Sequence, residues 1–333
     1  MKKLTVIDLF SGAGGLSRGF YDAGYDIIMG IDSDSSALKT FEKNHGNAKA
    51  MNLDLFNHEN IYVLEKYMKK ERKQLDVLVG GPPCQGFSLA GKRDETDERN
   101  ILYSAMVKAA EILRPRAIVL ENVTGMLTLY KGQAKEKIFK DFNKLGYKMN
   151  VKILYAPDYG VPQIRKRAFF VGILDSDVQF EYPNPTVKAE NYVTCEQAIG
   201  DLPSLINENN FSLDVVREYE SDPITEYQKK MRKGSKKIYN HIATNHTEKT
   251  IGYLSMIPDG GKYTDLPEEL AKNFKYRESL HRYTSDKPSL TIDTGHRTHF
   301  HYRYNRIPTV RENARLQSFP DNFIFFGNKQ DQY

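Results

Sequence analysis

The chain contains no tryptophan, only two cysteines and no long run of apolar residues. Two distant cysteines cannot build the disulfide framework of a secreted domain, and no Cys-x-x-Cys pair indicates structural zinc. No stretch approaches the ~20 apolar residues that cross a bilayer. The opening segment Met-Lys-Lys-Leu-Thr-Val-Ile-Asp reaches an aspartate too early for a secretory signal. We therefore expect a cytoplasmic protein with no membrane contact and no bound metal.

The length and composition are those of a large globular protein. Its 333 residues, 40% of them hydrophobic and 27% charged, exceed the usual size of a single core, so we expect one large domain and one smaller one. The 48 lysines and arginines outnumber the 43 acidic residues only slightly. A net charge of +5 is too small to establish a polyanionic partner. Where the positive residues lie in the sequence is therefore more informative than the net charge.

The first half alternates apolar runs with amphipathic stretches, which is the βαβ pattern of a parallel sheet covered on both faces. Beyond about Asp175 this pattern gives way to proline-rich, tyrosine-rich and basic segments. We therefore expect an α/β fold with a domain boundary near residue 180. The predicted strands are 4–9, 27–31, 75–79, 117–120, 151–154 and 168–173. The predicted helices are 36–44, 61–70, 101–113 and 136–145.

A glycine-rich loop, DLFSGAGGLSRGF at 8–20, joins the first predicted strand to a helix. Gly12, Gly14 and Gly15 permit positive φ and let a ligand lie against the backbone at the carboxyl edge of the sheet. The pattern favours a nucleotide-like cofactor over a merely tight turn. A dinucleotide site is the weaker alternative, because Ser17 stands where G-x-G-x-x-G has its third glycine.

Two aspartates follow strand-like segments close to this loop in the sequence. Asp32 ends the second predicted strand, where a carboxylate can accept both hydroxyls of a ribose. Asp54 follows residues 50–53 and is placed to accept a hydrogen bond from an adenine amino group. An isolated aspartate at such a position is more often a helix cap, so both interpretations of Asp54 stay open.

The stretch GGPPCQGFS at 80–88 holds Cys84 directly after two prolines and a predicted strand. This position puts the thiol at the same sheet edge as the glycine loop. A nucleophilic thiol needs an electropositive neighbour, because only a few per cent of an ordinary thiol is ionised near pH 7. Arg165 and Arg167 are candidates for that neighbour. The other cysteine, Cys195, is expected to be a small buried hydrophobic residue.

The run AIVLENV at 117–123 places Glu121 and Asn122 after four apolar residues. A carboxylate at the dry end of a strand is costly unless it is paired or protonated, and a raised pKa would let it donate a hydrogen bond. Two interpretations of Glu121 stay open at this point. It is a general acid, or it is paired structurally with an arginine.

Five motifs stand along the chain in a fixed order: the glycine loop, Pro-Pro-Cys-Gln, Glu-Asn-Val, QIRKR at 163–167 and RIPTVRENARLQSFPDNF at 306–323. In this order and over nearly the whole chain, the sequence resembles the DNA cytosine-5 methyltransferases. The resemblance implies a Rossmann-like class I S-adenosylmethionine-dependent methyltransferase domain at 1–180. A smaller target-recognition domain would occupy 181–333.

The resemblance also implies the cofactor and the substrate. The cofactor would be S-adenosylmethionine, the product S-adenosylhomocysteine and the substrate double-stranded DNA, with no metal taking part. Asp32 would hold the ribose and Asp54 the adenine. The remaining cofactor contacts would come from Phe10, Gly12, Gly14, Gly15 and Pro82.

The same resemblance gives Cys84 a chemical role. Carbon C5 of cytosine is not nucleophilic enough to take a methyl group, so Cys84 would first add to C6. Protonated Glu121 would hydrogen-bond N3, Arg167 would hold O2, and Arg165 would face a nearby phosphate or the carboxylate. Because none of these atoms is reachable in a stacked duplex, the cytosine would be flipped into the pocket.

The resemblance assigns DNA contacts to two further regions. The segment 88–99 would close over the flipped base as a lid, although a solvated connection is the ordinary fate of such a composition. Residues 183–303 would read bases in the major groove. The residues that would contact DNA are Gln85, Ser88, Arg99, Arg297 and Arg303. The block 306–323, with a helix start at Thr309 and internal charge pairs, is expected to have a structural role.

One departure from the family pattern leaves alternatives open. The family normally continues into a Gly-Asn-x-Val-Pro block and a helix that packs on the first domain, whereas this sequence ends at Tyr333. We expect a truncation, or a second polypeptide that supplies the block. The more serious alternative is a DNA-binding subunit that is inactive without a partner supplying the block. A redox enzyme on the same fold and a tRNA methyltransferase are weaker alternatives. A companion restriction endonuclease is a plausible partner.

Overall fold

The structure is a computed structural model that describes residues 3–71, 74–83, 101–206, 208, 210–272, 281–293 and 299–333. It divides into two compact units. Unit 1 comprises Met1–Leu154 and Lys166–Asn184, and unit 2 comprises Tyr155–Arg165 and Pro185–Tyr333. Five residues with predicted roles lie outside the described residues: Cys84, Gln85, Ser88, Arg99 and Arg297.

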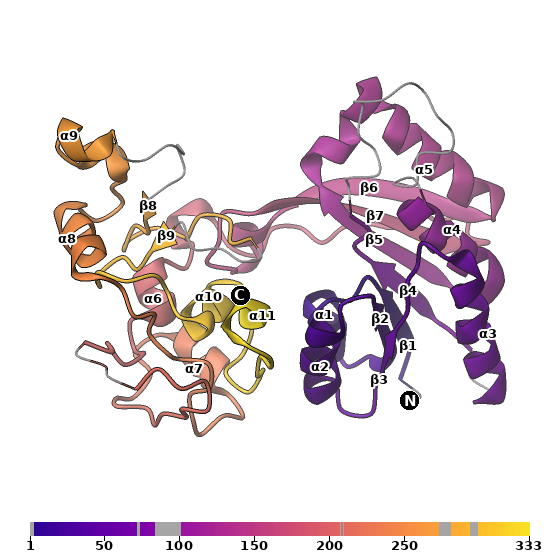
Figure 1. Ribbon diagram of the computed structural model, residues 1–333. Coiled ribbons are helices and arrows are strands. Elements are labelled where there is room, and N and C mark those ends of the chain that lie inside the picture. Colours follow the sequence, from indigo (N-terminus) through magenta and orange to yellow (C-terminus); the bar gives the residue numbers. More distant parts are fainter. Residues whose placement is uncertain are drawn as a thin grey trace. The chain divides into compact units, whose positions relative to one another are not determined.

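Unit 1 is built on a seven-stranded sheet in the order β3-β2-β1-β4-β5-β7-β6 (Figure 1). β7 runs antiparallel to β5, whereas the pairings among β1, β2, β3, β4 and β5 are all parallel. All six predicted strands are present, together with the short β3, and the predicted α/β fold is confirmed. The strands are β1 (Thr5–Leu9), β2 (Asp26–Asp32), β3 (Lys49–Asn52), β4 (Val77–Gly80), β5 (Ala117–Val123), β6 (Tyr147–Tyr155) and β7 (Lys166–Leu174).

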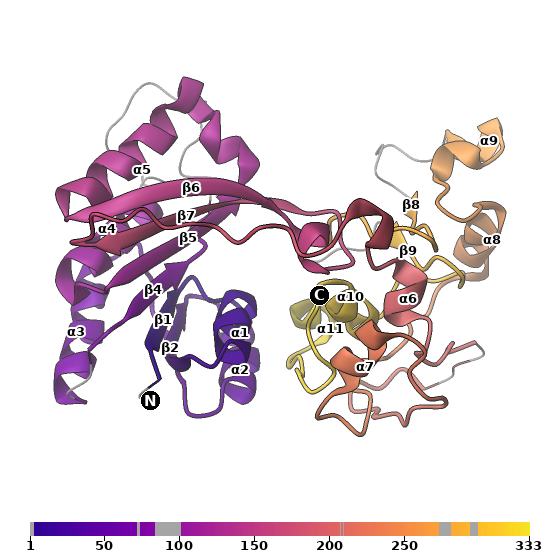
Figure 2. The same cartoon turned by 180° about the vertical axis from the view of Figure 1, so that it is seen from behind.

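Helices cover the two faces of this sheet unequally (Figures 1 and 2). α1 and α2 pack beside β1, β2 and β3, whereas α3, α4 and α5 lie on the other face. α2 begins where Asp34 accepts a hydrogen bond from the backbone N–H of Ser36 at 2.8 Å, one residue before the predicted start. The helices are α1 (Gly15–Asp22), α2 (Ser35–Asn44), α3 (Ile61–Lys70), α4 (Ile101–Leu113) and α5 (Gln133–Lys144). Short 3-10 helices lie at His58–Asn60, Thr124–Leu127 and Leu129–Gly132.

The parallel register brings the carboxyl ends of four strands to one edge. Leu9 of β1 pairs with Ile31 of β2 and with Gly80 of β4, and Gly80 pairs with Leu120 of β5. The residues that follow these positions therefore emerge together at the edge where open α/β sheets bind ligands. They belong to the glycine loop, to the Gly-Pro-Pro segment and to Glu-Asn-Val.

Unit 2 has little regular structure in its described residues. Its two buried clusters gather around Cys195, Tyr283 and Leu316, and around Leu254 and Phe300. Its elements are α6 (Cys195–Ile199), α7 (Glu226–Arg232), α8 (Glu248–Met256), α9 (Glu268–Ala271), β8 (His281–Arg282), β9 (His299–Phe300), α10 (Val310–Leu316) and α11 (Lys329–Gln332). Short 3-10 helices lie at Ala156–Tyr159, Ala189–Asn191 and Tyr263–Asp265.

The described residues show neither a membrane-spanning helix nor a metal-binding cluster. None of the helices there combines the length and the hydrophobicity that a membrane span requires. In the same part of the chain, no group of three or more His, Cys, Asp or Glu side chains is arranged to hold a metal ion.

Candidate active site

The glycine loop leaves β1 in a backbone conformation that few residues adopt. Phe10 has φ 61°, which is rare for a residue other than glycine and marks a constrained strand end. Gly12 has φ 51°, and a Cβ added there would meet nothing within 4 Å. A Cβ on Gly14 would instead lie 2.2 Å from Cε1 of His45. The absence of a side chain at Gly14 therefore lets the start of α1 pack closely against His45, whereas Gly12 faces open space.

Asp32 is tied to the glycine loop by a direct hydrogen bond. Its Oδ2 accepts from the backbone N–H of Gly12 at 2.8 Å, and its Oδ1 accepts from that of Asp34 at 2.9 Å. The side chain is half-buried at the end of β2. These contacts fix the carboxylate of Asp32 beside the glycine loop, and its contact with a ribose stays a prediction.

Asp8, which the sequence analysis did not single out, is a buried carboxyl beneath the same loop. It accepts a hydrogen bond from the hydroxyl of Ser17, whereas its Oδ1 has no hydrogen-bond partner among the described residues. Burial raises the pKa of Asp8 to about 7, and the negative charge of Asp32 adds to the shift. The only sequence signal was its place in the strand before the loop.

Asp54 caps a turn in the structure. Its Oδ1 accepts from the backbone N–H of Phe56 at 2.9 Å, and its carbonyl accepts from the side chain of Asn60 at 2.7 Å. Asp54 is therefore a turn residue and not a helix cap, because the 3-10 helix that follows is capped by Asn57. The side chain is exposed, so this contact does not close it to a ligand.

Glu121 and Asn122 both lie against the segment that leads to residue 84. A Cβ added to Gly81 would come within 3.4 Å of Oε2 of Glu121, so the carboxylate faces that backbone. The side-chain amide of Asn122 donates to the carbonyl of Pro82 at 3.0 Å and is buried. Asn122 therefore anchors the buried Pro82, a role that the sequence analysis did not assign to it.

Glu121 forms an ion pair with Arg167. Nε of Arg167 lies 2.9 Å from Oε1 of Glu121, and the side chains are 19% and 26% exposed, respectively. The antiparallel register of β5 and β7 brings them together, because Val123 pairs with Arg167 and Glu121 with Phe169. The structural pairing that the sequence left open is thus observed.

Arg165 belongs to unit 2, although only one residue separates it from Arg167. Its Nη1 donates to the carbonyl of Ile292 at 3.4 Å. The neighbouring Gln163 is fully buried, and its backbone forms a bridge with Ser289. The QIRKR motif therefore spans the change from one unit to the other, and its two arginines are held by different units.

The family model for C-5 cytosine-specific DNA methylases matches residues 4–333. The chain belongs to this family. The motif order had predicted this membership, which is confirmed, and with it the enzyme class of DNA cytosine-5 methyltransferase.

Known relatives of this methylase chain extend over almost its whole length. It is 37% identical over 330 residues to the Type II methyltransferase M1.HphI of Haemophilus parahaemolyticus, with 98% of this chain and 80% of that protein covered. It is 36% identical to M.DdeI of Desulfomicrobium norvegicum, with 98% and 81% covered. A solved prophage-encoded protein of Escherichia coli, described as a DNA modification methyltransferase, is 29% identical with a TM-score of 0.80, and 99% and 92% of the two chains are covered.

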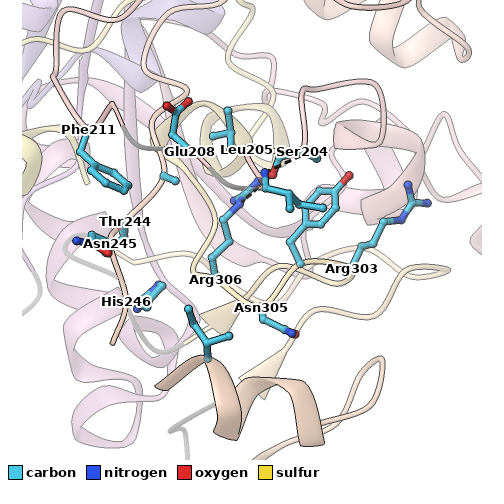
Figure 3. A pocket seen from close by; sticks show the side chains of 14 residues that line it. Ser204, Leu205, Glu208, Phe211, Thr244, Asn245, His246, Arg303, Asn305 and Arg306 are labelled. Carbon is cyan, nitrogen blue, oxygen red and sulfur yellow. Dashed lines mark hydrogen bonds between the residues drawn. The ribbon is translucent and has the colours of Figure 1, made fainter. Parts of the chain in front are cut away.

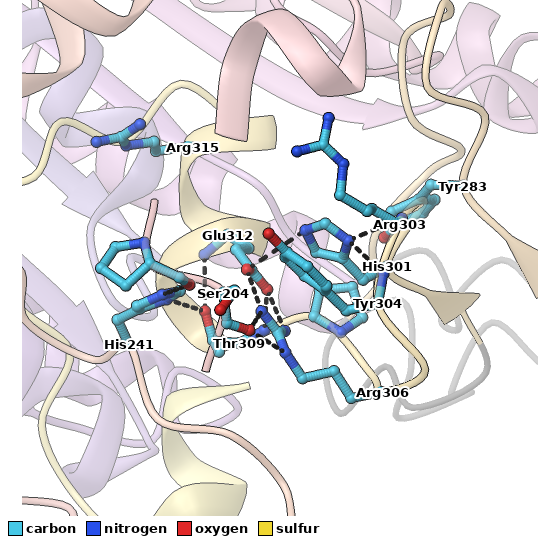
Figure 4. A network of polar contacts seen from close by, with 12 residues as sticks. Ser204, His241, Tyr283, His301, Arg303, Tyr304, Arg306, Thr309, Glu312 and Arg315 are labelled. Carbon is cyan, nitrogen blue, oxygen red and sulfur yellow. Dashed lines mark hydrogen bonds and ion pairs between the residues drawn. The ribbon is translucent and has the colours of Figure 1, made fainter. Parts of the chain in front are cut away.

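The Arg-Glu-Asn-Ala-Arg-Leu segment of the methylase lies in α10, which is buried throughout. Thr309 caps this helix and shares a reciprocal capping box with Glu312. Both oxygens of Glu312 accept from Arg306, at 2.7 Å each, and His301 approaches Glu312 at 3.5 Å (Figure 4). Burial alone would raise the pKa of Glu312, but Arg306 holds it well below its usual range. The helix start at Thr309 and the internal charge pairs predicted for this block are observed.

Arg303, predicted to contact guanine, lies on the exposed side of unit 2. Its Nη2 pairs with Oε1 of Glu196 on α6 at 2.5 Å, and both side chains are about half exposed, at 50% and 53%. Cys195, one residue before Glu196, is fully buried, and burial raises the pKa of its thiol. The expectation that Cys195 is a buried hydrophobic residue is confirmed.

Proposed function

We propose that this methylase transfers a methyl group from S-adenosylmethionine to C5 of a flipped cytosine in duplex DNA, through a covalent bond between Cys84 and C6. The observation that carries the proposal is the Glu121–Arg167 pair. It faces Gly81 at the carboxyl edge of the sheet, three residues before Cys84. A carboxyl and a guanidinium at that place suit the N3 and O2 edge of cytosine.

The glycine loop fits the cofactor. The space in front of Gly12 is open, and the carboxylate of Asp32 is fixed at its mouth. α1 begins after Gly14 without a side-chain cap, which suits the carboxylate of a methionine group. When bound, S-adenosylmethionine supplies an electrophilic methyl group. We assign its binding to Phe10, Gly12, Gly14, Gly15, Asp32, Asp54 and Pro82.

In the proposed chemistry, the thiolate of Cys84 forms a bond to C6 and the electron pair of the C5–C6 double bond moves toward C5. Glu121 donates a proton at N3, and Arg167 donates a hydrogen bond to O2. Because Arg167 holds Glu121 in the free protein, this step requires Arg167 to turn toward O2 so that Glu121 can carry the proton. Arg165 contacts phosphate or the carboxylate nearby.

The cycle closes when the enamine-like C5 has taken up the methyl group. The C5 proton leaves to water and the N3 proton returns to Glu121, so the C5–C6 double bond is restored as the Cys84–C6 bond breaks and releases the thiolate. The products are 5-methylcytosine and S-adenosylhomocysteine. A stacked base cannot present C6 to the thiol, so the proposal includes flipping of the cytosine, with residues 88–99 as the lid.

We assign DNA recognition to residues 181–333 and catalysis to residues 1–180. In the first segment Arg297 and Arg303 would hold guanine, and in the second Gln85, Ser88 and Arg99 would contact DNA near the flipped base. The Type II names of the relatives support a place in a restriction-modification system beside a companion endonuclease.

The test uses the 333-residue chain with S-adenosylmethionine labelled in the methyl group and mixed-sequence duplex DNA. We expect the label in 5-methylcytosine for the wild type and none for Cys84→Ser. Label in another nucleotide, or equal label with both chains, would refute the proposal. Equal-length duplex RNA in a parallel reaction is the control for substrate class.

A groove on unit 1 favours a second candidate, in which a further polypeptide packs on this face of the sheet. The groove holds about 670 Å³ over β4, β5 and β7, and its floor includes Val77, Val119, Val171 and Ile173. Val119 is half-buried there, whereas Leu120 on the opposite face is 3% exposed. An ordinary affinity of the chain alone for S-adenosylmethionine, measured by calorimetry, would contradict this candidate. A rise in affinity when such a polypeptide is added would support it.

A further inference from the structure

A short turn in unit 2, residues 302–306, is closed by its own backbone. The N–H of His301 donates to the carbonyl of Arg306 at 3.0 Å, and the N–H of Arg306 donates to that of Tyr304 at 2.8 Å. Nδ1 of His301 accepts from the N–H groups of Arg303 at 3.0 Å and Tyr304 at 3.2 Å. Burial lowers the pKa of His301 to about 3, so the ring stays neutral and keeps this acceptor at physiological pH.

Arg282 of β8 holds the same turn from behind. Its side chain is 4% exposed, and a guanidinium has five N–H donors and no acceptor. Nε donates to Ile257 at 2.9 Å, and Nη1 donates to His301 at 2.7 Å and Tyr304 at 3.1 Å, all to carbonyl oxygens. Nη2 donates to the carbonyl of Leu254 and, at 2.8 Å, to the side chain of Asn305. Every N–H of the guanidinium is therefore used.

The contact with Arg282 determines which way the Asn305 amide faces. Because the guanidinium can only donate, the atom of Asn305 that meets it has to be Oδ1. The NH₂ group of Asn305 therefore points away from Arg282, and the residue is exposed. The turn thus holds a hydrogen-bond donor in one orientation before any ligand is bound.

Asn305 borders a pocket of about 500 Å³ (Figure 3). Thr244, Asn245 and His246 line the pocket from another segment of unit 2. The pocket also contains Phe211, which is 38% exposed, and Ile206, which is 64% exposed. Asn305 therefore lies at a surface of unit 2 that a base edge can approach.

We propose that Asn305 reads one base pair of the DNA substrate through its NH₂ group, and that Arg282 is the positioning residue that orients this amide. The proposal rests on the proposed function, since it takes unit 2 as the part that binds duplex DNA. An amide that presents only its NH₂ group selects a major-groove acceptor, which guanine offers at O6 and N7, adenine at N7 and thymine at O4. It rejects cytosine, whose N4 group is itself a donor.

Asn305 differs in this respect from the neighbouring Arg303. Arg303 is engaged by Glu196 and has to leave that ion pair before it can bind a base or a phosphate. The donor of Asn305 needs no such rearrangement, because its partner Arg282 holds only the oxygen. Preorganisation of this kind increases specificity by lowering the cost of ordering on binding.

The experiment selects bound duplexes from a random-sequence library with the full chain and sequences them, so it does not depend on methyl transfer. The variant Asn305→Ala is expected to lose roughly tenfold or more of the discrimination at one position of the site, while other positions keep theirs. Asn322→Ala, at another exposed asparagine of unit 2, is the control and should keep the wild-type profile. An unchanged profile for Asn305→Ala, or no enriched sequence with the wild type, overturns the proposal.

Arg282→Lys tests the positioning role, because lysine keeps the charge but cannot reach five acceptors. We expect the same single position to lose discrimination, and the double variant with Asn305→Ala to lose no more than either single variant. Independent, additive losses at different positions would overturn the role of Arg282. Methyl transfer with an unchanged profile in all variants would refute this inference and leave the proposed function standing.

Discussion

The carboxyl of Asp8 lies under the glycine loop with a pKa raised to about 7 by burial. Between its usual value of 3.8 and about 7, the folded chain therefore binds a proton that the unfolded chain has released. The contribution of Asp8 to the free energy of unfolding is therefore fully present below pH 3.8 and is lost as the pH rises toward 7. Above about pH 7 Asp8 is ionised in the folded protein, and its buried charge beside Asp32 lowers the free energy of unfolding.

We expect Asp8→Asn to keep the hydrogen bond from Ser17 and to remove this cost. At pH 8 the variant should be more stable than the wild type by about 1 kcal/mol or more, and the difference should vanish near pH 4. Urea unfolding at several pH values measures it, with Asp222→Asn at an exposed carboxylate as the control. A difference that does not change with pH would contradict the assignment.

Substitutions of Glu121 and Arg167 test the proposed methyl-transfer step. Glu121→Gln cannot supply a proton at N3, so we expect methyl transfer to slow about 100-fold or more while binding of S-adenosylmethionine is unchanged. Arg167→Lys should retain more activity than Arg167→Ala, since it keeps the charge. Single-turnover kinetics measure these rates. Glu136→Gln, at an exposed glutamate of α5, is the control, and a rate equal to that of the control would refute the role of Glu121.

At the scale of elements, α10 depends on a buried ion pair. Removal of one partner of such a pair leaves the other charge uncompensated, which costs about 3 kcal/mol. We expect Glu312→Gln to lower the free energy of unfolding by this order, because Arg306 stays buried. Glu226→Gln on α7, where the pair with Lys229 is exposed, should change it by less than about 0.5 kcal/mol. Equal effects in denaturant unfolding would contradict the account.

The histidines around α10 make this part of the chain sensitive to acid. Burial lowers the pKa of His241 to about 4 and that of His301 to about 3, whereas both are near 6.5 when unfolded. The unfolded chain therefore binds more protons below pH 6.5, and stability falls as the pH falls through that range. We expect a slope of about 1.4 kcal/mol per pH unit for each histidine, and His241→Gln should remove about half of it. Unfolding curves between pH 7 and pH 4.5 measure the slope.

The sequence predicted those elements of the first unit whose signal is local. α3 and α4 have the predicted bounds, because apolar residues recur there at helical spacing. β5 runs through Glu121 to Val123, beyond the predicted end at residue 120, because pairing with β7 carries polar residues into the strand. Tertiary pairing of this kind has no trace in the hydrophobic pattern.

The sequence predicted which motifs belong to the candidate site, but it did not predict the contacts that their side chains make. Glycine spacing pointed to Gly12, but only the packing of His45 distinguishes the role of Gly14. Asp8 looked like an ordinary strand residue, and its raised pKa depends on burial that no local pattern encodes. Arg282 was one cation among many, and its five acceptors come from segments that are distant in the sequence.

At the scale of the whole molecule, the chain passes between its two units more than once. Tyr155–Arg165 leaves unit 1 between β6 and β7 and packs with unit 2 before Lys166 returns to the sheet. The QIRKR motif therefore belongs to both units, and the chain joins Arg167 directly to the unit that carries Arg303. The apolar pattern shows β6 and β7 but gives no sign of this excursion.

The most direct test of the central claim is a search for the covalent bond to Cys84. Duplex DNA with 5-fluorocytosine at the methylated position should trap the enzyme, because fluorine cannot leave C5 as the proton does. With S-adenosylmethionine present, mass spectrometry should find the DNA attached to the peptide that contains Cys84, and Cys84→Ser should give no adduct. Methyl transfer by the wild type without any such adduct, or an adduct at Cys195, would contradict the account.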